Sequence, residues 1–496
     1  MEIVQADSGA LAGAREGELL VFRNVPFAAP PVGERRFEAP GDVVPWTGVR
    51  DATKNGPIPP QSRSRLAEVM GDFVAEQSED CLSLTVWTPS TDAKRRPVLV
   101  WFHGGGFSSG AGSLPWYSGH ALARSGDIVV VSVNYRLGAL GYLYLPGLSE
   151  GNLGLLDNVA ALRWVRRNIE RFGGDPGMVT VAGQSAGAMS ILALMVSPLA
   201  SGLFRRAIPQ STAIGRLARA SEDAAAIGAQ YAELLGVPSN DAARLKAVPV
   251  PEILAAQGKI ARLRGEFGNP SPPFMLTVDG TTIPRDVLDA LHDGLGSDID
   301  LMIGTTREES AAFCVIDPAI RGAGEAQLLE IFQRIFGVDA ATYLGAYRAR
   351  RPAATTQALL TDVITDEQFL IKMLRLADWR AAAGRPAYVY QFDWQSPSPK
   401  PFAACHCLEL PFVFGNLEDW PDAPMLDGAD PVAVRALSGI MQRAWIAFVR
   451  TGSPNDATLP HWAPYEPDRR TTMRFDSLVG PVDDLAGLAR RLPWPA

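Results

Sequence analysis

A serine between two glycines is the residue whose surroundings most clearly indicate chemistry. It lies in Gly183-Gln184-Ser185-Ala186-Gly187, which follows an apolar run and precedes a stretch of small residues. This order predicts a buried strand that turns sharply into a helix, with Ser185 at the turn. A helix N-terminus at that point favours an anionic intermediate. Ser185 is therefore a candidate nucleophile, although an ordinary strand-to-helix turn can also contain a serine.

A glycine triplet upstream could supply hydrogen-bond donors to such an intermediate. The apolar run Arg96–Phe102 predicts a buried strand, and His103-Gly104-Gly105-Gly106-Phe107 follows it directly. Glycines at a strand end expose backbone N–H groups with no side chain in the way, as an oxyanion hole requires. A flexible loop is the alternative, and the position at the end of a buried strand favours the oxyanion hole.

A serine hydroxyl needs a base, and the chain has only five histidines from which to choose. His406 is the best candidate, because it follows a strand predicted at 386–394 and lies C-terminal to Ser185. His103 is expected to shape the glycine loop. His120, His292 and His461 are expected at exposed helix ends or in loops. A loop histidine that only packs is the alternative for His406.

A carboxylate should orient the base, and two candidates follow a strand predicted at 301–306. They are Glu308 and Glu309. Either residue could be the orienting acid by this argument alone, and the other would be a solvated carboxylate. The chain order of serine, acid and histidine is the order of the triad in the α/β-hydrolase arrangement.

The elements that must position these residues alternate between strands and helices. An amphipathic helix at 156–172 separates a strand at 128–135 from the strand before Ser185, which predicts parallel βαβ units. We therefore expect an α/β fold, with a mostly parallel central sheet flanked by helices, in a single catalytic domain over 1–496. Helical insertions at about 215–275 and 320–383 are expected to cover the site like a lid.

Two further expectations concern regions outside these units. Residues 56–76 look like a polar, mobile surface loop. No stretch is apolar over the roughly 18 residues that a membrane helix needs, and the N-terminus lacks the basic and apolar segments of a signal peptide. We therefore expect a cytoplasmic protein that does not associate with a membrane.

Composition excludes several kinds of partner. The net charge of -8 disfavours nucleic acid and anionic membrane surfaces. Four cysteines in 496 residues are too few for a disulfide framework. Cys405-His406-Cys407 has no second cluster to complete four metal ligands, so we expect no metal and no cofactor.

These motifs, with several others in the same order, resemble the type-B carboxylesterase family of para-nitrobenzyl esterases, carboxylesterases and cholinesterases. The resemblance covers nearly the whole chain and implies the α/β-hydrolase fold. Each motif alone is weak, but the ordered set is specific. The additional motifs are Pro30-Pro31-Val32-Gly33, Arg36-Phe37, Glu79-Asp80-Cys81-Leu82, Asn134-Tyr135-Arg136, Phe172-Gly173-Gly174-Asp175-Pro176 and Glu409-Leu410-Pro411-Phe412.

The resemblance implies roles for individual residues. The family's T-R-D-E-G loop is similar to residues 306–310, which makes Glu309 the acid and places Ser310 where the family has glycine. The implied oxyanion donors are the backbone N–H groups of Gly105, Gly106 and Ala186.

The resemblance also implies structural features. Arg36 should pair with Glu79 and Arg136 with Asp175, and Ser211 resembles a second serine buried near the acid. Secreted relatives pair the cysteine that corresponds to Cys81 with an upstream one. Because no cysteine precedes Cys81 here, we expect it to be free. Cys405 and Cys407 are expected to be packing residues, with an oxidation-sensitive site as the alternative.

The function implied is a serine carboxylic-ester hydrolase that forms an acyl-enzyme on small to medium apolar esters, as a monomer or weak homo-oligomer. An amidase or carbamate hydrolase with the same triad is one alternative. A non-catalytic adhesion-type homologue is disfavoured, because Ser185, Glu309 and His406 are all present. Candidates for an apolar pocket, although aromatic residues more often belong to the core, are Phe107, Trp116, Phe274, Phe313 and Phe412.

Overall fold

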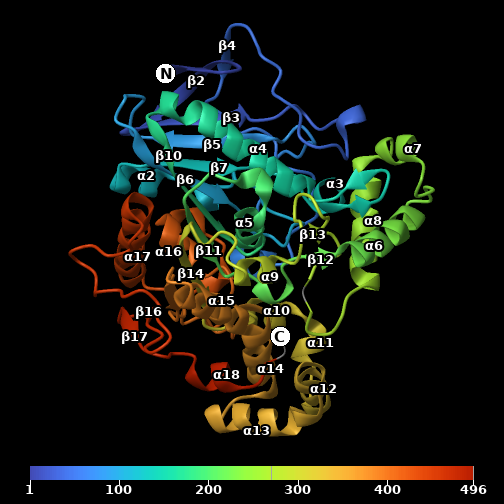
Figure 1. Cartoon of the computed structure of the whole chain (residues 1–496), viewed down its shortest axis with the longest axis vertical. Helices are drawn as coiled ribbons and strands as arrows, with labels where there is room; N and C mark the ends of the chain where they lie inside the picture. The colour runs from blue at the N-terminus through green and yellow to red at the C-terminus, as the bar shows by residue number, and fades with distance from the viewer. Residues whose placement is uncertain (270, 495–496) are drawn as a thin grey trace.

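A thirteen-stranded sheet crosses the molecule in the computed structural model, which describes residues 1–269 and 271–494 (Figure 1). Strand β4 (Val49–Asp51) pairs with β2 outside the main order. The other strands lie in the order β1 (Glu2–Ala6), β2 (Gly9–Glu16), β3 (Leu19–Pro26), β5 (Ser83–Thr88), β7 (Val129–Val133), β6 (Arg96–Phe102), β10 (Gly174–Gln184), β11 (Arg206–Gln210), β14 (Asp300–Thr306), β15 (Tyr388–Phe392), β16 (Thr472–Phe475) and β17 (Gly480–Val482).

The part of the sheet that carries the site is parallel. Every pair from β7 through β16 is parallel, whereas β1, β2, β3 and β5 form an antiparallel meander at one edge. In register, Gly183 of β10 lies beside Phe102 of β6, and Gln184 lies beside Gln210 of β11. The carboxyl ends of β6, β10 and β11 therefore meet at one edge. The predicted α/β fold with a mostly parallel sheet is confirmed.

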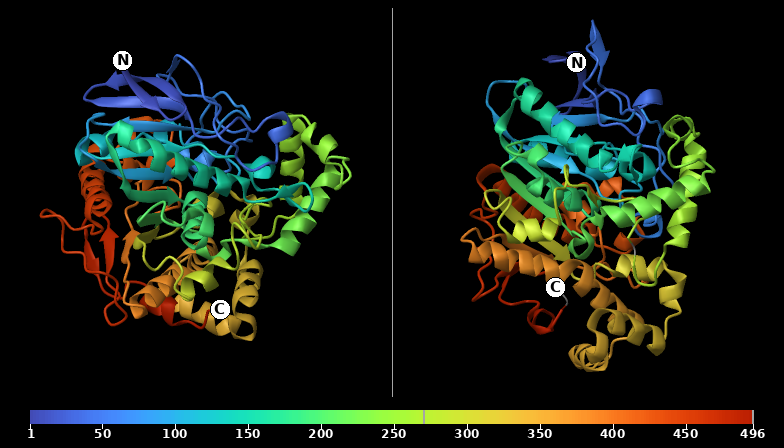
Figure 2. Two further views of the ribbon diagram at one scale, coloured as in Figure 1. Left: turned by 45° about the horizontal axis from the view of Figure 1, so that its top comes forward. Right: turned by 45° about the vertical axis from the view of Figure 1, so that its right-hand side comes forward.

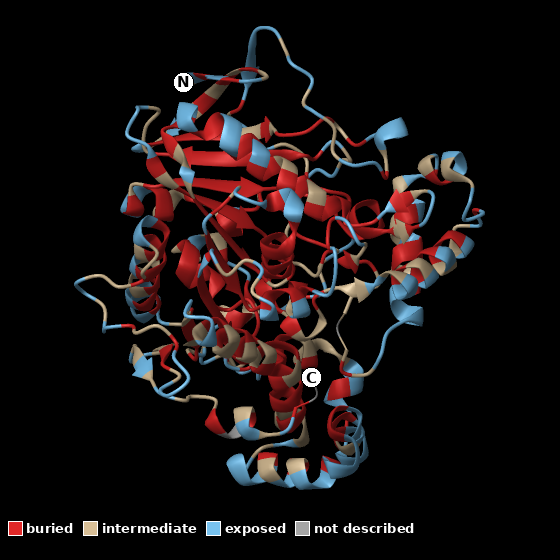
Figure 3. Ribbon diagram, in the orientation of Figure 1, coloured by how far each residue is buried: buried red, intermediate tan, exposed pale blue. Residues whose placement is uncertain are grey.

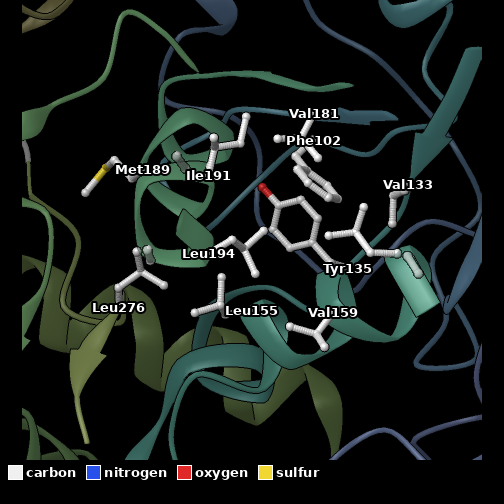
Figure 4. Packing of buried hydrophobic residues seen from close by; sticks show 14 of the residues in the cluster. Phe102, Val133, Tyr135, Leu155, Val159, Val181, Met189, Ile191, Leu194 and Leu276 are labelled. Atoms are coloured by element: carbon white, nitrogen blue, oxygen red, sulfur yellow. The ribbon is translucent and has the colours of Figure 1, made fainter. Parts of the chain in front are cut away.

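Alternate residues of each central strand enter different apolar layers, as the two-residue period of a strand requires. Along β6, Val98, Val100 and Phe102 join one cluster, whereas Leu99 and Trp101 join the other. The first layer includes α4 (Leu153–Asn168) and α5 (Ala186–Val196), whose side chains pack on the strands in Figure 4. The second includes α2 (His120–Gly126), α16 (Leu410–Phe414) and α17 (Pro431–Thr451). Burial in Figure 3 follows this arrangement, with the sheet enclosed and the outer helices exposed on one side.

Both predicted helical insertions are helical in the structure. The first contains α6 (Ser221–Leu234), α7 (Ala242–Lys246) and α8 (Val250–Leu263), and residue 270 within it lies outside the described residues. The second contains α12 (Glu325–Phe336), α13 (Ala340–Arg350), α14 (Thr356–Thr365) and α15 (Ile371–Ala382). In Figures 1 and 2, α6 to α8 lie at one side, whereas α12 and α13 lie at the end remote from β1 to β3. A separate apolar cluster joins α12, α13 and α14.

The expectation of a polar surface loop at 56–76 is wrong for residues 66–70. This segment contains α1 (Ala67–Met70), and Leu66, Val69 and Met70 are buried. Val69 and Met70 stand three and four residues after Leu66, so the three side chains share one face of a helical turn. The polar run at residues 61–65 directly before them concealed that period.

Helix α17 corrects the expectation that no stretch is apolar enough to span a membrane. Among the described residues it is the one helix with the length and composition of a membrane-spanning segment. Half of the most apolar stretch of α17 is buried inside the protein, and the helix packs against α16 and β6. A core helix of a globular protein can have the same length and composition. The burial and the contacts of α17 place it in the apolar layer that covers the sheet.

One of the two implied ion pairs is confirmed. Arg36 donates from Nε to Glu79 Oε1 at 2.7 Å and from Nη2 to Glu79 Oε2 at 2.5 Å. Its third nitrogen, Nη1, donates to the carbonyl oxygens of Lys246 and Val248 at 2.6 Å. Arg36 thereby joins the N-terminal segment to the loop between α7 and α8.

The other implied pair, Arg136 with Asp175, is wrong. Arg136 binds Asp157 of α4 through two nitrogens, at 2.9 and 2.7 Å, and both side chains are buried. Asp175 pairs instead with Arg95 at 2.8 Å. Arg136 follows the carboxyl end of β7, whereas Asp175 lies at the amino end of β10, so parallel strands hold the two at opposite edges of the sheet.

Asp157→Asn should therefore destabilise the protein strongly. The substitution leaves the Arg136 guanidinium buried without its counter-charge, which costs about 3–5 kcal/mol of unfolding free energy. Asp175→Asn is the matched control, because its partner Arg95 is 51% exposed and an exposed pair contributes about 0–1 kcal/mol. Urea unfolding of both variants measures the difference. Equal destabilisation by the two substitutions would contradict the pairing described here.

Candidate active site

Ser185 occupies a strained turn at the carboxyl end of β10, one of the central strands of the sheet. Strand β10 ends at Gln184 and α5 begins at Ala186, and Ser185 between them has φ 56° and ψ −120°. A positive φ is unfavourable for a residue with a side chain and persists where neighbours hold it. Here the Ser185 N–H donates to Gln210 O at 3.0 Å, and Met189 N–H donates to Ser185 O at 2.8 Å. Strand β11 and helix α5 thus hold Ser185 at the wall of a cavity.

The two glycines of the pentapeptide are required by close packing against β6. A Cβ atom on Gly187 would lie 2.0 Å from Phe102 O, and one on Gly183 would lie 2.6 Å from the same oxygen. Neither distance is compatible with a side chain. The turn therefore sits directly on the end of β6, which brings the glycine triplet next to Ser185.

A buried histidine and carboxylate face this turn. His406 Nδ1 lies 2.5 Å from Glu309 Oε2, and both residues are almost inaccessible to solvent. The other Glu309 oxygen, Oε1, accepts a hydrogen bond from Thr306 N–H at 2.8 Å. Glu308 Oε2 accepts instead from Ala404 N–H at 3.2 Å, and burial raises the pKa of Glu308. Glu309 is therefore the carboxylate that contacts His406, whereas Glu308 binds the backbone of Ala404.

The second imidazole nitrogen, His406 Nε2, faces the amide of Gln184. The Gln184 Nε2 atom lies 3.1 Å from His406 Nε2 and donates to Cys407 Sγ at 3.3 Å. Within the described part of the chain, no hydrogen bond joins Ser185 Oγ to His406, although both line one cavity. Catalytic hydrogen bonds in ligand-free sites are often long and tighten when substrate binds. With Nδ1 engaged by Glu309, Nε2 is the nitrogen that can accept a proton.

The glycine triplet adopts conformations suited to exposing N–H groups. Gly105 has φ 109° and Gly106 has φ 59°, and a Cβ atom on Gly105 would lie 2.0 Å from Ser109 O. A Cβ atom on Gly104 would lie 3.2 Å from Ser185 Cβ. For the residues described, the N–H groups of Gly105, Gly106 and Ala186 donate to no protein acceptor. Three N–H groups near Ser185 are therefore available to an oxyanion.

His103 holds the base of this loop, as the sequence predicts. Its Nδ1 lies 2.7 Å from Gly104 O, and the Tyr135 hydroxyl donates to His103 O at 2.6 Å. The Tyr135 ring also stacks on the imidazole at 4.3 Å between centroids. Burial lowers the pKa of His103 to about 4, so its imidazole is neutral at pH 7.

The cavity at Ser185 is narrow, about 60 Å³, and adjoins a second cavity of about 410 Å³. Arg65 and Phe313 line both. Of the five aromatic candidates, the structure places Trp116 and Phe313 at the cavity wall. It places Phe107 against Tyr142, Phe274 against Tyr231 and Phe412 against Phe392, in the apolar layers and away from the cavity.

Several residues near the site were not found from the sequence. Phe369 lies on a π-helical turn, η7 (Asp366–Leu370), with its ring centroid 5.4 Å from that of His406. Nothing in the sequence near Phe369 indicates that position. The segment around α1 contributes more residues to the cavity wall than Phe369 does. Its apolar period could have indicated that it packs against the rest of the protein. Cavity-lining residues that the sequence did not indicate are Ser64, Arg65, Leu66, Met70, Phe73 and Tyr117.

The cysteines and the two other serines occupy buried positions. All four cysteines are free, including Cys81 as predicted, and burial raises the pKa of Cys407. Ser211 is buried, and its hydroxyl has no hydrogen-bond partner in the described part of the chain. Ser310 has φ −74° and ψ −9°, so its turn does not need a glycine. Across residues 1–269 and 271–494, no three His, Cys, Asp or Glu side chains gather as metal ligands would.

Comparison with known proteins gives consistent matches over the whole length. The model of the carboxylesterase family matches residues 1–483. Phenmedipham hydrolase of Pseudarthrobacter oxydans is 40% identical, covering 99% of this chain and 97% of its own length. Para-nitrobenzyl esterase of Bacillus subtilis is 37% identical, covering 100% and 99%. A solved carboxylesterase of Geobacillus stearothermophilus superposes with a TM-score of 0.88 at 39% identity, covering 98% of this chain and 99% of that one.

Proposed function

Since this chain belongs to the carboxylesterase family, we propose that it cleaves esters with a catalytic triad of Ser185, His406 and Glu309. The protein is a carboxylic-ester hydrolase. The observation that supports the triad most directly is the 2.5 Å contact between His406 Nδ1 and Glu309, beside the turn that carries Ser185. This is the arrangement in which a base is oriented by an acid toward a nucleophile.

The reaction proceeds in two acyl-transfer steps. His406 Nε2 accepts the Ser185 proton as the hydroxyl oxygen attacks the ester carbonyl carbon, and the imidazolium then protonates the departing alcohol. Water attacks the acyl-enzyme with the same base accepting its proton, which releases the acid and restores Ser185. Glu309 holds the Nδ1 proton and stabilises the imidazolium charge throughout.

The tetrahedral intermediate needs donors aimed at its oxygen. The N–H groups of Gly105, Gly106 and Ala186 are unpaired and lie beside Ser185. One such donor typically contributes about 3–4 kcal/mol of transition-state stabilisation. Because these donors are backbone groups in a fixed loop, they need no reorganisation during the reaction.

The expected substrates are small to medium esters with an apolar body. Apolar and aromatic side chains form much of the cavity wall, and the space beside Ser185 is narrow, so the larger part of a substrate extends past Phe313. Carbamate hydrolysis is the favoured second candidate, because a whole-length relative is named phenmedipham hydrolase. An amidase activity has support of the same kind, because another whole-length relative is named a probable N-octanoylanthranilate hydrolase, and N-octanoylanthranilate is an amide.

The same proposal includes the setting in which the enzyme works. We place it in the cytoplasm as a monomer or weak homo-oligomer, with residues 1–496 forming one catalytic domain and no membrane or nucleic-acid partner. The acidic net charge and the four free cysteines support this setting. The insertions at 215–275 and 320–383 act as its lid.

Labelling with a serine-directed organophosphonate tests the proposal. The reagent should add to Ser185 alone, with loss of ester hydrolysis in proportion to labelling, as mass spectrometry of the digested protein would show. Labelling of another residue, or hydrolysis that persists in fully labelled enzyme, would contradict the assignment. Turnover of matched ester, carbamate and amide substrates then ranks the alternatives.

A further inference from the structure

An arginine that has no partner among the described residues lies beside the oxyanion loop. Arg65 lines both the cavity at Ser185 and the adjoining cavity of about 410 Å³. Its Nη2 atom lies 3.4 Å from the position that a Cβ atom on Gly106 would occupy. The guanidinium therefore stands between the proposed oxyanion donors and the larger cavity into which a substrate extends.

No carboxylate in the part of the chain that the structure describes neutralises this charge. Among residues 1–269 and 271–494, no ion pair or hydrogen bond engages the Arg65 side chain, whereas Arg63 pairs with Asp72 at 2.6 Å. None of the described residues that line the cavity at Ser185 is an Asp or a Glu. Acidic side chains do line the adjoining cavity, but none is close enough to pair with Arg65. They are Glu68, Glu266 and Asp317.

The surroundings of the guanidinium strengthen its attraction for an anionic partner. Arg65 is exposed to solvent, yet the protein atoms around its guanidinium partly desolvate it and lower the pKa of Arg65. Attraction between opposite charges is stronger in an enclosed site than in water. A guanidinium also presents two parallel N–H groups that match the two oxygens of a carboxylate.

We infer that Arg65 selects esters that carry a carboxylate a few bonds from the scissile carbonyl. This inference rests on the proposed triad, because the distance to the carbonyl is set by Gly106, whose N–H is a proposed oxyanion donor. The apolar body of the substrate packs on Leu66, Met70 and Phe313, while its carboxylate binds the guanidinium. The preferred substrate is thus an apolar ester with one negative charge.

The discrimination between charged and neutral esters comes from contact inside the cavity, not from long-range attraction. The whole chain has a net charge of -8, which does not attract anions from a distance. A charge pair that bound substrate shields from water is also screened less by salt than a pair on the open surface. The preference for a charged ester should therefore persist as ionic strength rises.

Paired chromogenic esters test the inference. The substrates are the para-nitrophenyl monoesters of glutaric and adipic acids and their neutral, methyl-capped counterparts, with rates corrected for spontaneous hydrolysis. The readout is the ratio of kcat/KM for the charged ester to kcat/KM for its neutral counterpart. Wild-type enzyme should favour a charged ester by at least about tenfold, and Arg65→Gln should reduce that ratio by at least about tenfold. Arg65→Lys should retain part of the preference, because it keeps the charge and loses the two-pronged geometry.

Arg63→Gln is the matched control. It removes the same functional group two residues away, where the side chain pairs with Asp72 outside the cavity, and it should keep the wild-type ratio. A wild-type ratio at or below one overturns the inference. Equal losses on charged and neutral esters in Arg65→Gln also overturn it, since Arg65 would then support the oxyanion or the fold in general.

The same assays separate this inference from the proposed function. Turnover of the neutral esters that disappears in Ser185→Ala upholds the triad even where the charge preference is absent. Turnover that survives Ser185→Ala, or the absence of any turnover in wild-type enzyme, overturns the triad and this inference with it.

Discussion

Replacing Ser185 by alanine should lower kcat for ester hydrolysis by about 10⁶-fold, because the attacking oxygen is lost while the site otherwise persists. The residual rate should still exceed that of the uncatalysed reaction, since the N–H groups of Gly105, Gly106 and Ala186 remain in place. Single-turnover kinetics with a para-nitrophenyl ester would measure the loss. No release of nitrophenol in a rapid first turnover should be detectable.

Ser197→Ala is the matched control for this prediction. Ser197 caps the other end of α5, is buried, and has a hydroxyl without a hydrogen-bond partner in the described part of the chain. Its removal should leave kcat within a few-fold of wild type. A similar loss in both variants would show that the serines act on the packing of α5 and not on the reaction.

Glu309→Gln should lower kcat by about 10⁴-fold with little change in the fold. The amide of glutamine can donate to His406 Nδ1, which places the imidazole proton on Nε2. A protonated Nε2 cannot accept the Ser185 proton. The loss should therefore appear in the acylation and deacylation rates, and pre-steady-state kinetics would resolve both.

Glu308→Gln provides the control, because the neighbouring carboxylate faces Ala404 and not the imidazole. Its kcat should stay within about tenfold of wild type. The two variants also decide between the candidates that chain position alone leaves open. A larger loss in Glu308→Gln than in Glu309→Gln would reverse the assignment of the acid.

Sequence patterns located the strands and the turn because buried parallel strands have a simple signature. The run Arg96–Phe102 is a strand with the predicted bounds, and Gly183 and Gly187 stand where the backbone of β6 leaves no room for a side chain. Each of these patterns lies within a short stretch of sequence, so it can be recognised without knowledge of the fold. The choice of Glu309 over Glu308 came from resemblance, since both follow one strand and only the loop geometry separates them.

Features that depend on distant segments were less predictable. Arg136 could reach any carboxylate at its edge of the sheet, and the strand directions, not the motifs, exclude Asp175. The aromatic candidates illustrate the same limit: Phe107 and Phe313 were both candidates from the sequence, but one packs on Tyr142 and the other lines the cavity. Arg65 went unnoticed because nothing in its own segment reveals that the side chain lines the cavity beside Ser185.

The contact between Gln184 and His406 joins residues 222 positions apart, and this separation has a consequence for the growing chain on the ribosome. Strands β6, β7, β10 and β11 are all complete once residue 210 has been made. At about 5–20 residues per second, His406 follows roughly 10–40 s later. A nascent chain can thus assemble the serine turn and the glycine loop while it is unable to hydrolyse anything. Esterase activity therefore reports that synthesis has passed His406 and that the segment around it has joined the earlier strands.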